Sequence, residues 1–223
     1  MDEFYREGEV APSSSTLLEG PGDTPLVAMI GPPNSGKPTL FNRLTGLRQK
    51  VANYPGVTVE KHVGRAYLPG AEFVDVVDLP GVHGFSARSL DEQITRNVLE
   101  GRIEGLRAPD ALVLIVDSTR LESQLMLVEP LLELAMELRD GEEMPYRLFL
   151  TMFDVRTTRT NTTVVDRLRK HRKNLLKTYI GKSERLNQAN LESKPIKEHS
   201  PGARGVREYD ALAKNVAAVV QRL

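Results

Sequence analysis

The sequence contains no cysteine, which excludes disulfides, thiolate metal ligands and cysteine nucleophiles. It has no excess charge of either sign, with 30 basic and 30 acidic residues, and this argues against a strongly basic nucleic-acid binder. No apolar run approaches the ~20 residues that a membrane-spanning helix needs. The acidic start, Met1-Asp2-Glu3-Phe4, lacks the apolar stretch of a signal peptide. These absences predict a soluble protein, with the cytoplasm as its expected location.

Length and composition bound the domain organisation. A chain of 223 residues, 40% of them hydrophobic, is long enough to bury one sizeable core. Residues 1–24 are rich in Ser, Pro, Gly and Glu, and we expect them to form a disordered leader. The remainder, 25–223, is expected to be a single domain.

Strand-like and helix-like segments alternate after the leader. Strands are expected at 25–30, 60–68, 72–78, 110–117, 146–152 and, weakly, 177–181. Helices are expected at 38–46, 89–104, 121–139, 161–176 and 203–222. Strands that are apolar throughout suit a sheet covered on both faces, and their alternation with helices favours parallel pairing. The pattern predicts a three-layer α/β fold with a mainly parallel sheet flanked by helices.

A glycine-rich loop follows the first predicted strand. Its sequence is Gly31-Pro-Pro-Asn34-Ser35-Gly36-Lys37-Pro38-Thr39, with the spacing of the phosphate-binding motif G-x-x-x-x-G-K-[ST]. In that motif the backbone N–H groups surround a polyphosphate, the lysine reaches the β- and γ-phosphates, and a helix N-terminus faces the anion. The loop therefore predicts a P-loop NTPase fold and a nucleotide site formed by Gly31, Asn34, Ser35, Gly36 and Lys37.

Proline at position 38 departs from the motif. It removes the hydroxyl that would bind Mg²⁺, removes a backbone N–H facing phosphate, and restricts the conformation of Lys37. Proline is well tolerated in the first turn of a helix, so we expect an intact fold with a weaker site. Thr39 is the remaining hydroxyl and is counted among the nucleotide-binding candidates, although helical geometry turns it away.

Three segments resemble the G domain of the ferrous iron transporter B (FeoB) family. The first is the glycine-rich loop with the helix expected after it. The second is the run Asn53-Tyr-Pro-Gly-Val-Thr58-Val-Glu60, which resembles the first switch, and the third is Asp78-Leu-Pro-Gly81, which is similar to the D-x-x-G switch. The resemblance covers about 25–135. It implies a GTPase that uses GTP, with GDP as product, and Mg²⁺.

The resemblance also implies roles for individual residues. Thr58 would bind Mg²⁺ and sense the γ-phosphate, Asp78 would hold Mg²⁺ through water, and the Gly81 N–H would contact the γ-phosphate. Asn34 would help to hold K⁺. With Lys37, the residues Thr58, Gly81 and Asn34 form the implied catalytic set. Val82 follows the glycine where other GTPases carry glutamine, so no side chain there orients water.

The base-reading motif N-K-x-D is altered in the second half. Thr151-Met-Phe-Asp154 keeps the aspartate, which we predict accepts hydrogen bonds from guanine, but replaces asparagine with Thr151. A later Ser-Ala loop is also expected, and Gly202-Ala203-Arg204 is the nearest candidate.

Residues 146–223 resemble the chromosome-partitioning ATPase family (ParA/Soj) instead. The resemblance is carried by Leu150-Thr-Met-Phe-Asp-Val-Arg-Thr157, by Arg185-Leu-Asn-Gln-Ala189 and by Gly205-Val-Arg-Glu-Tyr-Asp-Ala-Leu-Ala-Lys214. The lysine near the start of that family's phosphate loop is missing. The two resemblances together suggest a chimera of two P-loop NTPases, joined along the helix at 121–139.

The main prediction is a purine-nucleotide-binding protein with GTP favoured over ATP, and a weak GTPase if active. Its expected partners are the nucleotide and a membrane transporter module that this chain lacks. The first alternative is a partitioning-type ATPase that binds ATP, dimerises on it and contacts DNA, for example through the basic run at 167–173. The second is a hybrid or engineered scaffold whose nucleotide binding is impaired by Pro38.

Overall fold

The computed structural model describes residues 24–33, 35–45, 49–66, 73–82, 89–138, 144–192, 194 and 196–220. Apart from Thr24, the predicted leader lies outside these residues, and so does Asn34.

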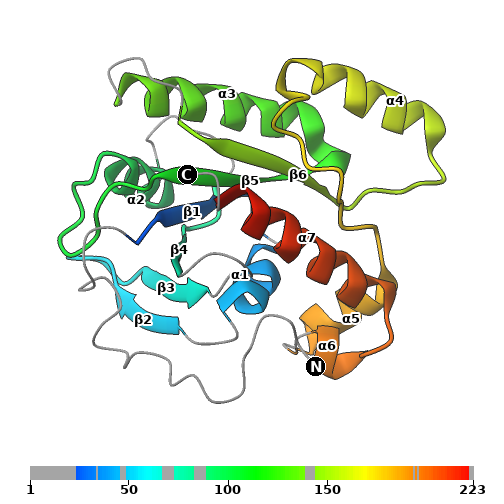
Figure 1. The fold of residues 1–223 in the computed structure, drawn as a ribbon, viewed down its shortest axis with the longest axis horizontal. Coiled ribbons are helices and arrows are strands. Elements are labelled where there is room, and N and C mark those ends of the chain that lie inside the picture. The colour runs from blue at the N-terminus through cyan, green and yellow to red at the C-terminus, as the bar shows by residue number, and fades with distance from the viewer. Residues whose placement is uncertain are drawn as a thin grey trace.

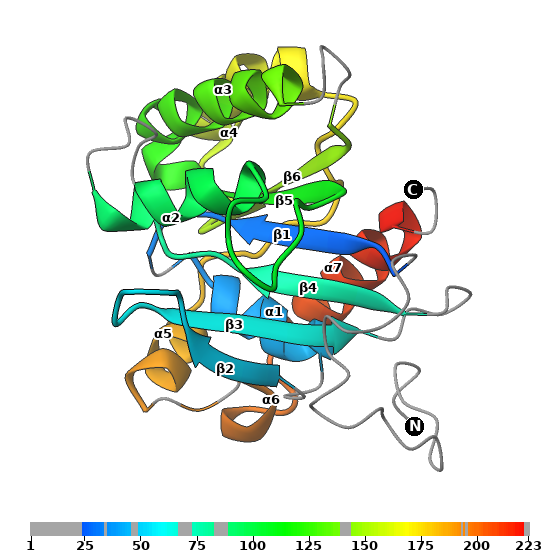
Figure 2. The ribbon, with the colours of Figure 1, turned by 90° about the vertical axis from the view of Figure 1, so that its left-hand side faces the viewer.

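A six-stranded sheet forms the centre, in the order β2-β3-β4-β1-β5-β6 (Figures 1 and 2). The strands are β1 (Leu26–Ile30), β2 (Gln49–Asn53), β3 (Glu60–Ala66), β4 (Val74–Asp78), β5 (Ala111–Asp117) and β6 (Tyr146–Thr151). β1 pairs in parallel with β4 and β5, and β5 pairs in parallel with β6, while β3 runs antiparallel to β2 and β4. The prediction of a mainly parallel sheet is confirmed.

Helices cover both faces of this sheet. They are α1 (Lys37–Thr45), α2 (Leu90–Leu99), α3 (Leu121–Glu137), α4 (Thr158–Arg167), α5 (Glu184–Leu191), α6 (Ile196–His199) and α7 (Arg204–Val220), with short 3₁₀ turns η2 (Ser118–Arg120) and η3 (Arg169–His171). One apolar core joins the sheet to α2 and α3, and a second joins its other face to α1 and α7. Figure 2 shows the α1–α7 layer and the α2–α3 layer on opposite sides of the strands.

The sheet buries the central strands completely, as their sequences predict. All five residues of β1 and all five of β4 are buried, including Asp75 and Asp78. Asp75 is neutralised by Arg65 of β3. The Arg65 Nε donates to the Asp75 Oδ1 at 2.7 Å, and a terminal guanidinium nitrogen donates to Oδ2 at 3.0 Å. Asp78, at the C-terminal end of β4, faces the phosphate loop.

Three expectations need correction. β2 was not predicted, because its sequence Gln-Lys-Val-Ala-Asn is polar and it lies at the edge of the sheet. The weak strand at 177–181 does not form. The chain there makes isolated bridges from Leu175 to Leu148 of β6 and from Gly181 to Phe153, just after β6, and the Ile180 N–H donates to Leu150 of β6. The helix expected at 161–176 is α4, which ends at Arg167, since the chain must turn to bring Asn174 and Leu176 into hydrogen bonds with Leu148.

Among the described residues, no helix has both the length and the apolar character required to cross a bilayer.

Candidate functional site

The glycine-rich loop is wound tightly between β1 and α1. A Cβ atom on Gly31 would lie 2.8 Å from the Ile115 Cβ and 3.2 Å from the Ser35 Oγ, so only glycine fits there. Gly36 has φ +84°, a conformation that favours glycine, and its carbonyl accepts the Leu40 N–H at 3.1 Å in the first turn of the helix. The two glycines of the motif are thus required by close packing and by backbone conformation.

Lys37 forms a buried ion pair with Asp78. Its Nζ donates to the Asp78 Oδ1 at 2.5 Å and to the Leu79 carbonyl at 2.6 Å, and the lysine is 6% exposed. Burial raises the pKa of the Asp78 carboxyl, and the positive charge of Lys37 partly opposes this shift. The predicted phosphate-binding lysine and the predicted Mg²⁺ ligand are therefore in direct contact.

The D-x-x-G segment lies against the glycine-rich loop. The Leu79 N–H donates to Met29 at 3.1 Å, and the Val82 N–H donates to Gly31 at 3.2 Å. A Cβ on Gly81 would lie 2.9 Å from the Pro33 side chain. Gly81 is thus placed beside the loop, where its conversion to any larger residue would push the two segments apart.

The first-switch segment folds into a turn that buries Tyr54. The Tyr54 N–H donates to Val59 at 2.9 Å, the Val57 N–H donates to Tyr54 at 3.2 Å, and Gly56 has φ +77° at the turn. The Tyr54 side chain is 1% exposed, and burial together with the negative charge of Asp78 raises its pKa well above the usual value. Thr58 is exposed on this turn. The segment therefore presents Tyr54 to the region of Asp78, and Thr58 to the surface.

A cavity of about 480 Å³ extends from the glycine-rich loop to the end of β6. Its walls come from the loop, from the end of β6 and the residue after it, from the segment before α5 and from α5 and α7: Ser35, Gly36, Thr151, Met152, Ile180, Gly181, Ser183, Leu186, Asn187 and Tyr209. The Ser35 Oγ and the Thr151 Oγ1 are buried in the described structure without a hydrogen-bond partner. Buried hydroxyls normally have a hydrogen-bond partner, and these two have none among the described protein groups.

Tyr209 connects α7 to the glycine-rich loop, a contact that the sequence analysis missed. Its hydroxyl donates to the Gly36 carbonyl over 3.4 Å and also hydrogen-bonds with the Thr39 side chain. Burial raises the pKa of this phenol well above its usual value, so it stays neutral. Thr39 therefore bonds to α7, and its role in nucleotide binding stays a prediction. The only sequence signal for Tyr209 was its place on the apolar face of the last predicted helix.

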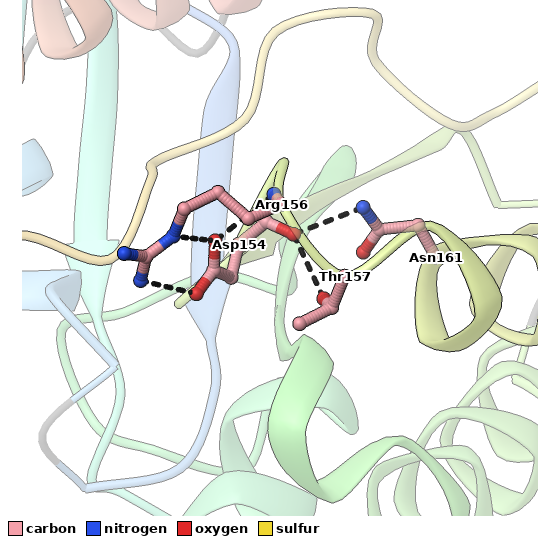
Figure 3. A network of polar contacts seen from close by, with 4 residues as sticks. All are labelled: Asp154, Arg156, Thr157 and Asn161. Carbon is pink, nitrogen blue, oxygen red and sulfur yellow. Dashed lines mark hydrogen bonds and ion pairs between the residues drawn. The ribbon is translucent and has the colours of Figure 1, made fainter.

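The Thr151–Asp154 segment lies at the far end of the cavity. Thr151 and Met152 line it, and Met152 has φ +57°, an unusual value for a residue with a side chain. Asp154 is not among the lining residues; its carboxylate is held by Arg156 (Figure 3). Residues 180–183 form the adjoining part of the cavity wall, since Gly181 pairs with Phe153. Gly202-Ala203-Arg204 does not line this cavity, and its assignment to the Ser-Ala loop stays a prediction.

Few groups are available to hold Mg²⁺. No cluster of three or more His, Cys, Asp or Glu side chains suited to a metal occurs in the described part of the chain. Asp78 supplies one carboxylate, whereas Pro38 supplies no hydroxyl where the motif requires one. Such a site fits Mg²⁺ only if phosphate oxygens complete its coordination. Asn34, the implied K⁺ residue, lies outside the described residues.

Comparison with known proteins decides the family. The family model described as "Ferrous iron transport protein B" matches residues 26–175, more than half of the chain. The chain belongs to the ferrous iron transport protein B family. It is 46% identical over 108 residues to the Fe(2+) transporter FeoB of Methanocaldococcus jannaschii and 37% identical over 129 residues to that of Leptospira biflexa. These matches cover 48% and 58% of this chain but only 15% and 17% of the two transporters.

Solved FeoB structures share the fold. The G domain of T. maritima FeoB is 28% identical, with a TM-score of 0.53, and the match covers 85% of this chain and 98% of that one. A mutant of S. thermophilus NFeoB, described as bound to GDP, is 28% identical with a TM-score of 0.55 and coverage of 86% and 64%. The P-loop NTPase fold predicted from the loop is confirmed.

The comparisons give no support to a chimera of two families. The FeoB family match continues through the helix at 121–137, where the junction was expected, and on to residue 175. The structural match to the T. maritima G domain covers still more of the chain. The basic run expected to contact DNA is partly neutralised, because Arg167 pairs with Glu122 at 3.2 Å and Lys170 pairs with Glu129.

Proposed function

We propose that this chain binds purine nucleotides as the G domain of a FeoB-type protein, with GTP and GDP favoured over ATP and ADP. The observation that carries the proposal is a cavity that begins at Ser35 and Gly36, next to buried Lys37, and ends at Thr151 and Met152. The cavity thus joins the predicted diphosphate-binding loop to the segment predicted to read the base. Solved relatives described as GDP-bound and GMPPNP forms support a guanine nucleotide.

The phosphates would be bound by the loop amides and by Lys37. To reach them, the Lys37 ammonium would have to leave Asp78, whose carboxylate then becomes free to face Mg²⁺ through water. The exchange separates little charge, because the phosphates replace the Asp78 carboxylate as the anionic partner of the Lys37 ammonium. The helix dipole of α1 adds to the attraction for the phosphates.

Hydrolysis, if it occurs, would transfer the γ-phosphoryl group to water. Lys37 would neutralise charge on the transferred group, with Thr58 and the Gly81 N–H as sensors of the γ-phosphate. Mg²⁺ would supply further charge neutralisation, and K⁺ held near Asn34 would act in the same way. Thr58 is exposed on its turn, so the first switch must rearrange before it can contribute. Val82 is buried and cannot orient water, which favours slow turnover.

Pro38 is expected to weaken both binding and turnover. Pro38 is the second residue of α1, and the helix forms with proline at this position. The missing hydroxyl and N–H belong to the loop's contacts with Mg²⁺ and phosphate, and a charge-assisted contact of this kind is worth ~1.5–3 kcal/mol.

The wider role proposed is that of a regulatory domain on the cytosolic side of a ferrous iron transporter. The family membership supports it, as does a solved relative described as the cytosolic domain of an iron transporter. The membrane module would be a separate segment or chain.

Calorimetric titration of the purified chain with GDP, GTP and ADP, with and without Mg²⁺, tests the proposal. We expect GDP to bind, ADP to bind more weakly, and Lys37→Ala to lose binding by at least a hundredfold. Lys173→Ala, which removes an exposed lysine, is the matched control and should bind as the parent does. Failure of the parent chain and of Pro38→Thr to bind any purine nucleotide would exclude the proposed function.

A further inference from the structure

Arg156 holds the aspartate that is expected to read the base. The Nε of Arg156 donates to the Asp154 Oδ1 at 2.9 Å, and a terminal nitrogen donates to Oδ2 at 2.8 Å (Figure 3). The Arg156 N–H adds a third bond to Oδ1 at 3.0 Å. Both carboxylate oxygens therefore accept hydrogen bonds from a single residue two positions away.

The backbone of Asp154 is fixed as well. Its carbonyl accepts from the Thr157 hydroxyl at 2.9 Å and from the Asn161 side-chain amide at 2.9 Å, at the start of α4. Phe153, just before it, accepts the Lys182 N–H at 3.0 Å and donates to Ile180 at 3.2 Å. These two bonds of Phe153 hold the residue before Asp154 against the 180–183 wall of the cavity. The hydrogen bonds from Arg156 and, to a smaller extent, the charge of Lys182 in that segment lower the pKa of the Asp154 carboxyl. Asp154 is thus positioned beside the cavity, with its carboxylate engaged by Arg156.

The two donors of Arg156 reproduce the edge of a guanine ring. Guanine presents N1–H and the exocyclic N2–H as parallel donors from a planar N–C–N unit, which is the same chemical fragment as a guanidinium. A bidentate pair to one carboxylate is the geometry that both prefer. Adenine presents no such pair of donors on its corresponding edge.

We propose that Arg156 is an internal competitor for guanine: it occupies the Asp154 carboxylate and so weakens the selectivity of this site for guanine over adenine. The inference rests on the proposed function. The Arg156 side chain is 82% exposed, so its guanidinium can leave Asp154 and move into solvent. The competition is therefore reversible. An exposed pair of this kind is weak, and its removal should therefore change guanine affinity by about three- to tenfold.

The test compares the parent chain, Arg156→Ala and Arg156→Lys by displacement of a fluorescently labelled GDP with unlabelled GDP, IDP and ADP. Inosine lacks the exocyclic amine and can satisfy only one carboxylate oxygen. We expect Arg156→Ala to bind GDP about three- to tenfold more tightly, IDP with a smaller gain, and ADP with none. Arg156→Lys, which lacks the planar fork, should shift in the same direction as Arg156→Ala.

Two further variants sharpen the result. Arg102→Ala removes an exposed arginine that pairs, at 2.5 Å, with Glu100 two residues away, and it should leave all three affinities unchanged. Asp154→Asn should abolish the GDP-specific gain of Arg156→Ala when the two are combined. An equal change for GDP, IDP and ADP, or no change, overturns the role of Arg156 while leaving nucleotide binding intact. Absence of binding by every variant, including the parent, overturns the proposed function and this inference with it.

Discussion

The two ends of the cavity differ in how they are built. At the phosphate end, Lys37 and Asp78 form a buried ion pair, and Gly81 packs against Pro33 of the glycine-rich loop. At the base end, Asp154 and Arg156 form a pair at the surface, next to a residue with positive φ. The phosphate end resists change because its charges are compensated in the interior. The base end can change its contacts at little cost, so selectivity is expected to vary more readily than phosphate binding.

The largest effect should come from breaking the buried pair. Lys37→Met leaves the Asp78 carboxylate without its cation, and removing one partner of a buried pair costs about 3 kcal/mol of unfolding free energy. Urea denaturation measures this loss. The double variant Lys37→Met/Asp78→Asn should recover most of it, because no charge is then left buried; a double variant as unstable as the single one contradicts this account of the phosphate end.

Gly36→Ala tests the contact between the loop and α7. Alanine is strained at φ +84°, and its Cβ would collide with the Tyr209 hydroxyl, so we expect a loss of about 2 kcal/mol. In a Tyr209→Phe background the collision disappears and only the backbone strain, roughly half of the loss, should remain. Thermal unfolding of the four proteins in the cycle gives the coupling. Equal losses in both backgrounds would show that Tyr209 does not restrain the loop.

Pro38→Thr should strengthen the phosphate end without altering the base end. Restoring the hydroxyl and the N–H is expected to tighten GDP and ADP alike by about tenfold or more in Mg²⁺. Titration with both nucleotides provides the comparison, and Pro201→Thr, at an exposed turn, is the matched control. A gain confined to GDP would mean that Pro38 acts on base recognition instead.

The smallest effect concerns His171, which does not line the cavity. Burial and the neighbouring charge of Lys170 lower its pKa, with Glu129 opposing the shift, and its Nδ1 lies 3.0 Å from the Tyr146 hydroxyl. A histidine whose folded pKa is depressed binds fewer protons in the native state, so stability is retained above the unfolded pKa of ~6.5 and lost as pH falls below it. Between pH 7.5 and pH 5.5, the free energy of unfolding measured with urea should decrease less for His171→Gln than for the parent. Equal decreases would exclude this residue as a source of acid sensitivity.

Much of the phosphate end could be predicted from the sequence, because its residues follow one another at fixed spacing. The loop between a buried strand and a helix, and Asp78 at a strand end, are local features that the fold preserves. The direct contact between Lys37 of the loop and Asp78 was not predicted, because the motif describes contacts with the nucleotide and not those within the protein. Tyr54 was part of a recognised segment, yet its burial depends on packing that no local pattern reveals.

The base end could be predicted less well. Tyr209 and the 180–183 wall reach the cavity only through the tertiary fold, from segments distant in sequence from the loop. Asp154 was assigned to guanine from its motif, but the competing Arg156 two residues later was not considered. The resemblance of 146–223 to a second family suggested a chimera, whereas the comparisons support a single FeoB-like fold.

A crystal structure of the chain grown with excess GDP and Mg²⁺ tests the central claim most directly. We expect the diphosphate on the loop amides between Gly31 and Lys37, the Lys37 Nζ moved from Asp78 to a phosphate oxygen, and the base against Met152 and the 180–183 wall. GDP bound elsewhere, or a cavity without nucleotide and with Lys37 still paired to Asp78, would contradict the account.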